Sequence, residues 1–198
     1  MKVGVLAIQG DFAAHAWMIR RAGHDVVFVR RPRDLDSVAA LVLPGGESTA
    51  MLRGIARDRL ENPLRSFFAS ERPVLATCAG AILVARRVYH PEQPSYGAID
   101  VDIERNAYGT QRDSFEAMAE TDDAHAPFAG LRCVLIRAPR ITRTGPTVCV
   151  HARVRGTPAL VSDGPLWAAT FHPELTEDTR VIEAVLGNGA RPVYRVGA

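Results

Sequence analysis

The chain has 198 residues, the size of one ordinary domain, and we expect a single domain over residues 1–198. Lys and Arg number 24 against 22 Asp and Glu, so the net charge of +2 offers no basic excess for nucleic-acid binding. No apolar run approaches the roughly 18 residues of a membrane helix, and the first residues lack the pattern of a secretory signal. Composition therefore argues against a nucleic-acid-binding, membrane or secreted protein and predicts a cytoplasmic one.

Short apolar runs alternate with helical segments over the first 90 residues. We expect strands at 3–8, 26–29, 40–43 and 74–76, and helices at 11–22, from about 49, near 63–70 and at 81–87. The first strand is continuously apolar, as in a strand that is buried on both faces of a parallel sheet. Asp11 is placed to cap the first helix and Gly23 to end it. The alternation predicts an α/β fold with a mainly parallel sheet.

The second half of the chain changes character. Strand candidates at 98–104, 133–137, 148–154, 159–161 and 166–170 are separated by turns rather than by long helices. Strands joined by short turns run antiparallel, so this half should add a small antiparallel portion to the sheet. A closing helix is expected at 177–186, ending before Gly187.

Cys78 stands between an apolar strand and a helix, with small residues on both sides. A lone cysteine is commonly a buried core residue, but this pattern is typical of a nucleophile elbow, a strained turn that exposes a nucleophile above the sheet. The start of the helix behind Cys78 favours the thiolate and offers N–H groups to an oxyanion. With Cys133 and Cys149 it makes an odd, widely spaced set without metal-site spacing. We therefore interpret Cys78 as a candidate nucleophile and expect no metal and no cofactor.

A thiol nucleophile needs a base, and the base needs an orienting group. His172 follows the last apolar strand and is separated from Glu174 by one proline. In an extended segment, residues i and i+2 point to the same side, so Glu174 can bind one ring nitrogen of His172 while the other nitrogen faces a thiol. The remaining histidines are interpreted as surface or structural residues: His15, His24, His90, His125 and His151.

Residues 44–48 read Pro-Gly-Gly-Glu-Ser and follow the third expected strand. Two glycines let the backbone turn sharply at the carboxyl end of a strand, where open α/β sheets bind ligands. The N–H of Gly46 can therefore join the N–H of Ala79 in an oxyanion hole. In isolation these residues would indicate a plain turn, and the pattern of a phosphate-binding loop is absent.

With these residues in view, the chain resembles the SNO family of glutaminase subunits of pyridoxal 5′-phosphate synthase, a branch of the class I glutamine amidotransferases. The triad motifs are shared by the whole class, whereas four stretches are typical of this branch: PGGEST at 44–49, ERNAYG at 104–109, DSFE at 113–116 and IRAP at 136–139. The resemblance spans almost the whole chain. Ala76 stands where the elbow commonly has glycine, a departure that removes no catalytic group.

The resemblance implies a three-layer, flavodoxin-like class I glutamine amidotransferase fold with a mixed, mainly parallel central sheet and a small antiparallel portion in the second half. It implies a catalytic triad in which Cys78 is the nucleophile, His172 the acid and base, and Glu174 the orienting group. The reaction would be the hydrolysis of L-glutamine to L-glutamate and ammonia. Glutamine would be held by residues of three motifs: Gly46, Glu47, Ser48, Arg105, Ile136 and Arg137.

The resemblance also implies a protein partner. Ammonia would pass to the synthase (lyase) subunit for pyridoxal 5′-phosphate (vitamin B6) biosynthesis. Gln9 and Gly10 end the first strand at the same sheet edge and would lie where this partner docks and helps to complete the oxyanion site. Arg105 and Arg137 also suit L-glutamine chemically, because a zwitterion needs a guanidinium or backbone donors for its carboxylate.

Three alternatives remain. An amidotransferase subunit that feeds a different synthase would lack the ERNxxG and IRAP motifs, which are present. A cysteine hydrolase of the PfpI type also has an elbow but lacks the late His-Pro-Glu. A non-catalytic subunit with the same fold would have lost a member of the triad, and none is lost.

Overall fold

The computed structural model describes residues 1–105, 107, 114–124 and 126–187. Its centre is a seven-stranded sheet with the strand order β10-β11-β12-β4-β3-β1-β2. The strands are β1 (Lys2–Leu6), β2 (Asp25–Val29), β3 (Ala40–Leu43), β4 (Val74–Thr77), β10 (Cys149–Val154), β11 (Thr157–Asp163) and β12 (Leu166–Ala169). Strands β12, β4, β3, β1 and β2 run parallel, and β10 and β11 join them antiparallel. The expected mixed, mainly parallel sheet is confirmed.

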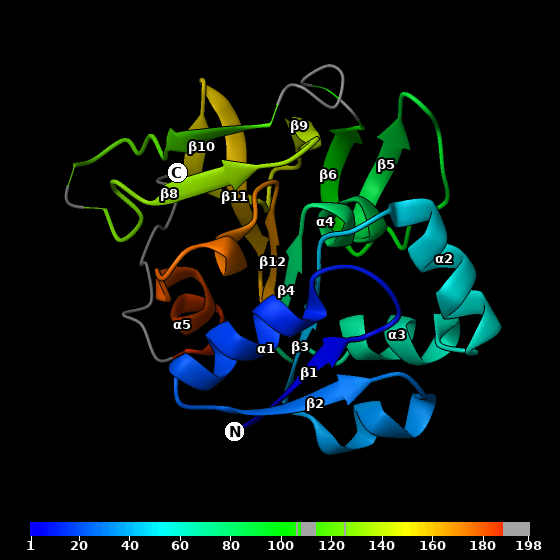
Figure 1. The fold of residues 1–198 in the computed structure, drawn as a ribbon. Helices are drawn as coiled ribbons and strands as arrows, with labels where there is room; N and C mark the ends of the chain where they lie inside the picture. Colours follow the sequence, from blue (N-terminus) through cyan, green and yellow to red (C-terminus); the bar gives the residue numbers. More distant parts are fainter. Residues whose placement is uncertain (106, 108–113, 125, 188–198) are drawn as a thin grey trace.

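Two layers cover the sheet (Figure 1). One layer consists of α1 (Phe12–Arg21), α5 (Arg180–Leu186) and a two-stranded sheet of β7 (Phe115–Met118) and β8 (Arg132–Leu135). The other consists of α2 (Ser48–Arg57), α3 (Glu61–Phe68), α4 (Ala79–Val84) and a three-stranded sheet of β5 (Ala85–Tyr89), β6 (Ile99–Glu104) and β9 (Arg140–Thr144). Within the described part of the chain, no helix has the length and apolar character needed to cross a bilayer.

The central strands are apolar throughout because both of their faces are buried. In β3, Leu41 and Leu43 point into the core beneath α2, α3 and α4. Ala40 and Val42, between them in sequence, point into the core beneath α1 and α5. Strand β4 divides its residues between the two cores in the same way. A continuous apolar run is thus the pattern of a doubly covered strand.

The strand order brings four chain segments to one edge of the sheet. β12, β4, β3 and β1 are parallel neighbours, so their carboxyl ends meet. Gln9 follows β1, and Gly45 follows β3. Cys78 follows β4, and His172 follows β12. Topology alone therefore gathers the candidate residues that the sequence places at strand ends.

Several elements differ from the sequence expectation, and α4, β5, β7 and β9 differ most. Helix α4 ends at Val84 instead of continuing to residue 87, and the chain goes on as β5, which pairs in parallel with β6. Arg86 and Arg87 are both exposed in β5, so the strand lacks the regular alternation that would indicate it. Strands β7 and β9 are also unexpected, and in β9 only Ile141 is buried. Pairing with neighbouring strands forms these elements in the absence of a clear local pattern.

Helix α4 lies so close to the end of β3 that Gly80 has no room for a side chain. A Cβ on Gly80 would lie 2.2 Å from the carbonyl oxygen of Leu43, a backbone atom that cannot rotate away. At an open helical position, alanine is favoured over glycine by about 1 kcal/mol. The close approach reverses this preference at Gly80 and holds the turn between β4 and α4 against the end of β3.

We expect Gly80→Ala to lower the free energy of unfolding by about 1–3 kcal/mol, the usual cost of overpacking, as measured by urea denaturation. The matched control is Ala56→Gly at an exposed position of α2, where glycine should be the destabilising residue. A Gly80→Ala variant that is as stable as the wild type would contradict this packing.

Candidate active site

Cys78 lies in the turn between β4 and α4 with φ +46° and ψ −104°, a conformation that residues other than glycine rarely adopt. Its N–H donates to the carbonyl oxygen of Ala169 (2.8 Å), and its own carbonyl oxygen accepts from the N–H of Ile82 (3.2 Å). These contacts hold the strained turn, and Cys78 is 6% exposed. Strain of this kind is concentrated at functional positions.

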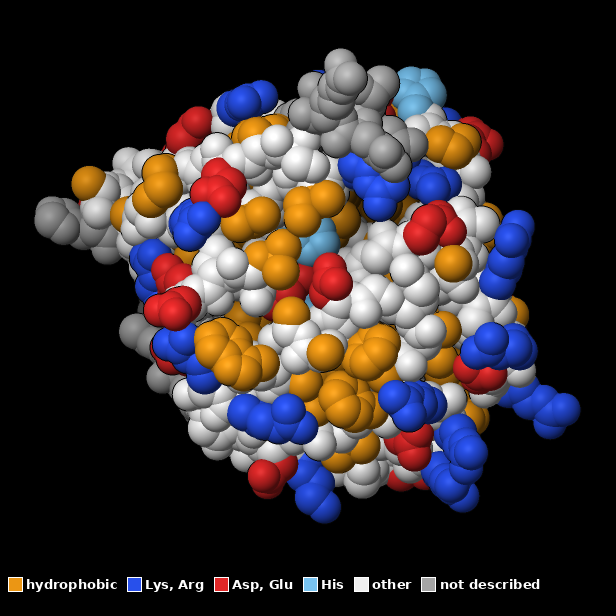
Figure 2. All heavy atoms as spheres, viewed as in Figure 1, with side chains coloured by type: hydrophobic (Ala, Val, Ile, Leu, Met, Phe, Trp, Pro, Cys, Tyr) orange, Lys and Arg blue, Asp and Glu red, His pale blue; other side chains and the backbone are white. Residues whose placement is uncertain are grey.

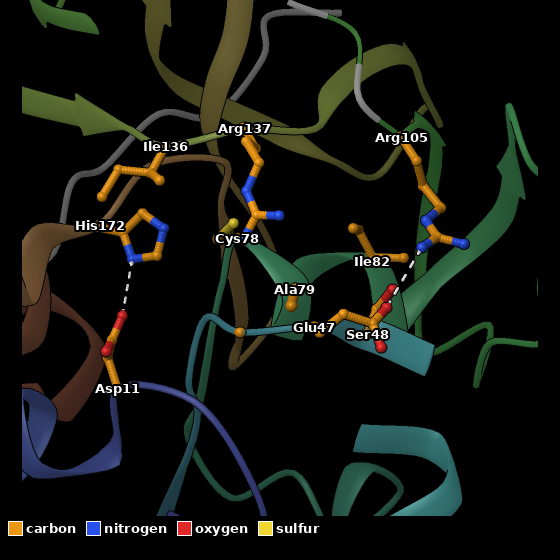
Figure 3. A pocket seen from close by; sticks show the side chains of 11 residues that line it. Asp11, Glu47, Ser48, Cys78, Ala79, Ile82, Arg105, Ile136, Arg137 and His172 are labelled. Carbon is orange, nitrogen blue, oxygen red and sulfur yellow. Dashed lines mark ion pairs between the residues drawn. The ribbon is translucent and has the colours of Figure 1, made fainter. Parts of the chain in front are cut away.

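His172 brings an imidazole to Cys78 from the neighbouring strand. Nδ1 of His172 lies 2.7 Å from Oε1 of Glu174, and the other ring nitrogen points toward Cys78 (Figure 3). Both His172 and Glu174 are buried. The backbone differs from the expected extended segment, because Pro173–Leu175 forms a short 3₁₀ helix (η2). The two side chains therefore meet across a turn, yet the three residues come together as the sequence predicts.

For each residue of this pair, burial and the neighbouring polar groups have opposite effects on the pKa. Burial lowers the pKa of His172, but hydrogen bonds to Cys78 and Glu174 outweigh it and raise the pKa above the ordinary histidine value. Burial raises the pKa of Glu174, but its electrostatic and hydrogen-bonding contacts with His15 and His172 hold it far below the usual carboxyl range. Glu174 is therefore a carboxylate, and it favours an imidazolium on His172 beside the thiol.

Gly45 allows the turn after β3 to pack directly on the cysteine and the histidine. A Cβ on Gly45 would lie 2.4 Å from Cε1 of His172 and 3.3 Å from Cβ of Cys78. Only a glycine lets the imidazole lie over the thiol at this position. The sequence predicts a role for the next residue, Gly46, in the oxyanion hole, but it does not show which of the two glycines faces the imidazole.

Gln9 and Gly10 pack against the same turn. A Cβ on Gly10, where φ is +94°, would lie 1.8 Å from the carbonyl oxygen of Gly45. Oε1 of Gln9 accepts a hydrogen bond from the N–H of Glu47 (2.8 Å) and would lie 2.4 Å from a Cβ on Gly46. The loop after β1 is thus tied to the turn that carries Gly46.

One pocket of about 300 Å³ joins these segments. The candidate residues that line it are Gly46, Glu47, Ser48, Cys78, Ala79, Arg105, Ile136, Arg137 and His172. Glu174 is not part of the lining and contacts His172 from within the core. Gln9 and Gly10 pack against the turn after β3. Figure 2 shows a histidine side chain near the centre of this face, with acidic side chains beside it and apolar side chains around it.

The pocket has a charged end away from the thiol (Figure 3). Nη2 of Arg105 lies 3.7 Å from Oε1 of Glu47. The Glu47 carboxylate also accepts the N–H groups of Thr49 and Ala50, at 2.9 and 2.7 Å, and so caps α2. Arg137, with φ +46°, adds a second guanidinium to the lining. Guanidinium groups suit the carboxylate of a zwitterionic amino acid, and a carboxylate suits its ammonium group.

Asp11 precedes α1 as expected, but its side chain makes no capping hydrogen bond. Instead Oδ2 lies 4.0 Å from Nδ1 of His172, and Asp11 lines the pocket (Figure 3). Among the residues that the structure describes, Asp11, His172 and Glu174 form a group with metal-ligand spacing. Nδ1 of His172 is already bound to Glu174 at 2.7 Å, so this group is better suited to orienting an imidazole than to holding a metal ion.

His15 is a second residue of the site that sequence reasoning missed. It is fully buried, and its Nε2 lies 3.2 Å from Oε2 of Glu174. A signal was available, because His15 shares a helix face with the buried residues Met18 and Ile19, three and four positions further on. Spacing could show that His15 is buried but not which carboxylate it meets.

Known proteins resemble this chain over nearly its full length. The model of the SNO glutamine amidotransferase family matches residues 5–188. The chain is 47% identical over 186 residues to the pyridoxal 5′-phosphate synthase subunit PdxT of Koribacter versatilis, with 94% of each chain covered. It is 44% identical over 199 residues to the subunit of the same name from Deinococcus radiodurans, covering 98% of this chain and 100% of that one.

A solved structure agrees with these relatives. The crystal structure of a glutamine amidotransferase superposes with a TM-score of 0.85 at 39% sequence identity, covering 93% of this chain and 97% of that one. The expected fold of a class I glutamine amidotransferase is therefore confirmed. The chain belongs to the SNO glutamine amidotransferase family.

Proposed function

We propose that this chain hydrolyses L-glutamine to L-glutamate and ammonia through Cys78, His172 and Glu174, and that the ammonia serves pyridoxal 5′-phosphate synthesis. One observation carries the proposal. A cysteine on a strained turn lies beside a histidine that is bound to a buried carboxylate, and both open into a pocket with a charged far end. The partner that we propose is the lyase subunit of the synthase, and the names of the two relatives, both subunits of pyridoxal 5′-phosphate synthase, support a synthase partner. The proposed location is the cytoplasm.

The pocket accommodates glutamine in one direction. The side-chain amide lies toward Cys78, and the zwitterionic end lies toward Arg105 and Glu47. A guanidinium of Arg105 or Arg137 takes the carboxylate, and the Glu47 carboxylate takes the ammonium group. Ser48 and Ile136 complete the wall of the pocket.

The reaction proceeds through a covalent intermediate. The Cys78 thiolate attacks the carbonyl carbon of the side-chain amide, and the N–H groups of Gly46 and Ala79 stabilise the oxyanion, each donor contributing on the order of 3 kcal/mol. His172 gives a proton to the departing ammonia and leaves a glutamyl thioester on Cys78. His172 then takes a proton from water, which attacks the thioester and releases glutamate.

Docking of the synthase acts through the loop after β1. Because Oε1 of Gln9 holds the N–H of Glu47, a partner that moves Gln9 and Gly10 also moves the turn that carries Gly46. The oxyanion site is then completed in the complex. A non-catalytic role is disfavoured because the residues of the triad are present and in contact.

We expect Cys78→Ala to reduce glutamate formation, measured with the synthase subunit present, by at least about 10⁴-fold, because no nucleophile remains. Cys133→Ala is the matched control, since Cys133 is buried in the core on the α1 and α5 side of the sheet and does not line the pocket. Undiminished hydrolysis by Cys78→Ala would show that Cys78 is not the nucleophile.

We expect Arg105→Gln to raise the KM for glutamine by about tenfold or more and to change kcat less, because it removes a charge-assisted contact from the far end of the substrate. Steady-state kinetics measures this effect. Arg86→Gln is the control, because Arg86 pairs with Asp100 outside the pocket. Equal KM values in the two variants would show that Arg105 does not bind substrate.

The low pKa of Glu174 predicts a pH-dependent stability difference between the wild type and Glu174→Gln. A carboxyl with a depressed folded-state pKa stabilises the fold above its unfolded value, here 4.5, and loses that contribution as pH falls toward the folded value. We expect the wild type to be more stable at pH 7 by about 1–3 kcal/mol and the difference to shrink below pH 4.5. Chemical denaturation at each pH measures it, and a difference that stays constant or grows on acidification would contradict the prediction.

A further inference from the structure

The buried histidine His15 takes no part in the proposed mechanism. His15 lies on α1 and is fully buried, on the helix face that also buries Met18 and Ile19. Its imidazole is absent from the residues that line the pocket and reaches Glu174 instead. Burying an imidazole beside apolar side chains is costly unless its polar atoms find partners. The partners of His15 therefore indicate why a histidine stands here.

Glu174 lies between two imidazoles. Its Oε1 lies 2.7 Å from Nδ1 of His172, and its Oε2 lies 3.2 Å from Nε2 of His15. The same Nε2 lies 3.0 Å from Oγ1 of Thr77, which precedes Cys78 at the end of β4. All of these side chains are buried. The His15 imidazole thus links helix α1 to the end of strand β4 and to the turn after β12.

The surroundings of His15 indicate which nitrogen carries the hydrogen. Among the residues that the structure describes, Nδ1 of His15 is buried with no hydrogen-bond partner. A hydrogen on Nδ1 would leave a buried donor unpaired and would turn the lone pair of Nε2 toward a carboxylate. With the hydrogen on Nε2, Thr77 and Glu174 can both accept it. Among the described residues, Oε2 of Glu174 has no hydrogen-bond partner of good geometry, so the 3.2 Å contact with Nε2 of His15 is oblique. Catalytic hydrogen bonds are commonly misaligned in this way before substrate binds.

We propose that His15 is a positioning residue for the catalytic triad. Its Nε2–H holds Oε2 of Glu174, and Thr77 holds the ring, so that Oε1 of Glu174 stays aligned with Nδ1 of His172. His15 touches neither the thiol nor the substrate and acts through Glu174 alone. The proposal rests on the proposed role of Glu174 in glutamine hydrolysis. An apolar residue at this position would fill the same space but would leave Oε2 without a donor.

Two substitutions at His15 separate positioning from packing. The side-chain amide nitrogen of glutamine reaches the place of Nε2, whereas that of asparagine reaches only the place of Nδ1. His15→Gln and His15→Asn therefore bury the same amide on the same helix face, but only the glutamine can donate to Glu174. His151→Asn is the matched control, because Nε2 of His151 bonds to Oγ of Ser162 (2.7 Å), away from the pocket.

The first readout is steady-state glutamine hydrolysis with the synthase subunit present. We expect His15→Asn to lower kcat by about 10- to 100-fold, the effect of a small misplacement of a catalytic group, while KM changes by less than about twofold. His15→Gln should retain most of the wild-type kcat. His151→Asn should retain all of it.

The second readout is an NMR titration of the His172 imidazole in the isolated chain, which requires no hydrolysis of glutamine. Burial lowers the pKa of His172, and the hydrogen bonds to Cys78 and Glu174 raise it, so a misaligned Glu174 should shift the titration midpoint downward. We expect a downward shift of at least about one pH unit in His15→Asn and no shift in His15→Gln. Asp11, which also faces Nδ1 of His172, is unchanged in both variants.

The proposal is overturned if folded His15→Asn keeps the kcat and the His172 titration of the wild type, or if the two His15 variants lose activity equally. If the wild type hydrolyses no glutamine, the proposed function fails, and the NMR titration still decides the role of His15. If His15→Asn does not fold, Thr77→Val takes its place, because it removes the hydroxyl that holds the ring. An unchanged His172 titration in that variant would equally refute the proposal.

Discussion

The site depends on the close approach of backbone segments at one edge of the parallel sheet. The carbonyl oxygen of Leu43 occupies the space of a Cβ on Gly80, and the imidazole of His172 occupies the space of a Cβ on Gly45. These contacts set the separation between the strained cysteine, the imidazole and the turn that carries Gly46. The geometry of the candidate site is therefore specified by the packing of β3, β4 and β12 rather than by flexible side chains, as a preorganised site requires.

The buried Glu174 carboxylate orients the imidazole of His172 within this geometry. An ionised glutamate in the protein interior is costly unless polar groups surround it. Nδ1 of His172 bonds to Oε1 of Glu174, and Nε2 of His15 lies 3.2 Å from Oε2. Burial acts against both shifts: contacts with the two imidazoles lower the pKa of Glu174, and hydrogen bonds to Cys78 and Glu174 raise the pKa of His172. Helix α1 thereby becomes part of the site, although its residues lie far from the triad in sequence.

The sequence predicts the parallel strands and the residues at their ends, because a doubly buried strand is an unbroken apolar run and ligands bind where such strands end. That rule predicts Cys78 and Gly46 as site residues. It also predicts His172, because Glu174 stands two residues further on. Strands β5 and β9 have few buried residues and form by pairing with β6, so no local pattern indicates them. Arg105 came from family resemblance alone, and His15 was missed because contact with Glu174 arises only in the folded chain.

If Cys78 is the nucleophile that we propose, it carries a covalent glutamyl intermediate during turnover. The most direct measurement is mass spectrometry of the chain after acid quenching of its reaction with glutamine in the presence of the synthase subunit. We predict a glutamyl thioester on the peptide that contains Cys78, formed and consumed as ammonia appears. Steady release of ammonia with no adduct on that peptide at any time, or with the adduct on another cysteine, would contradict the account.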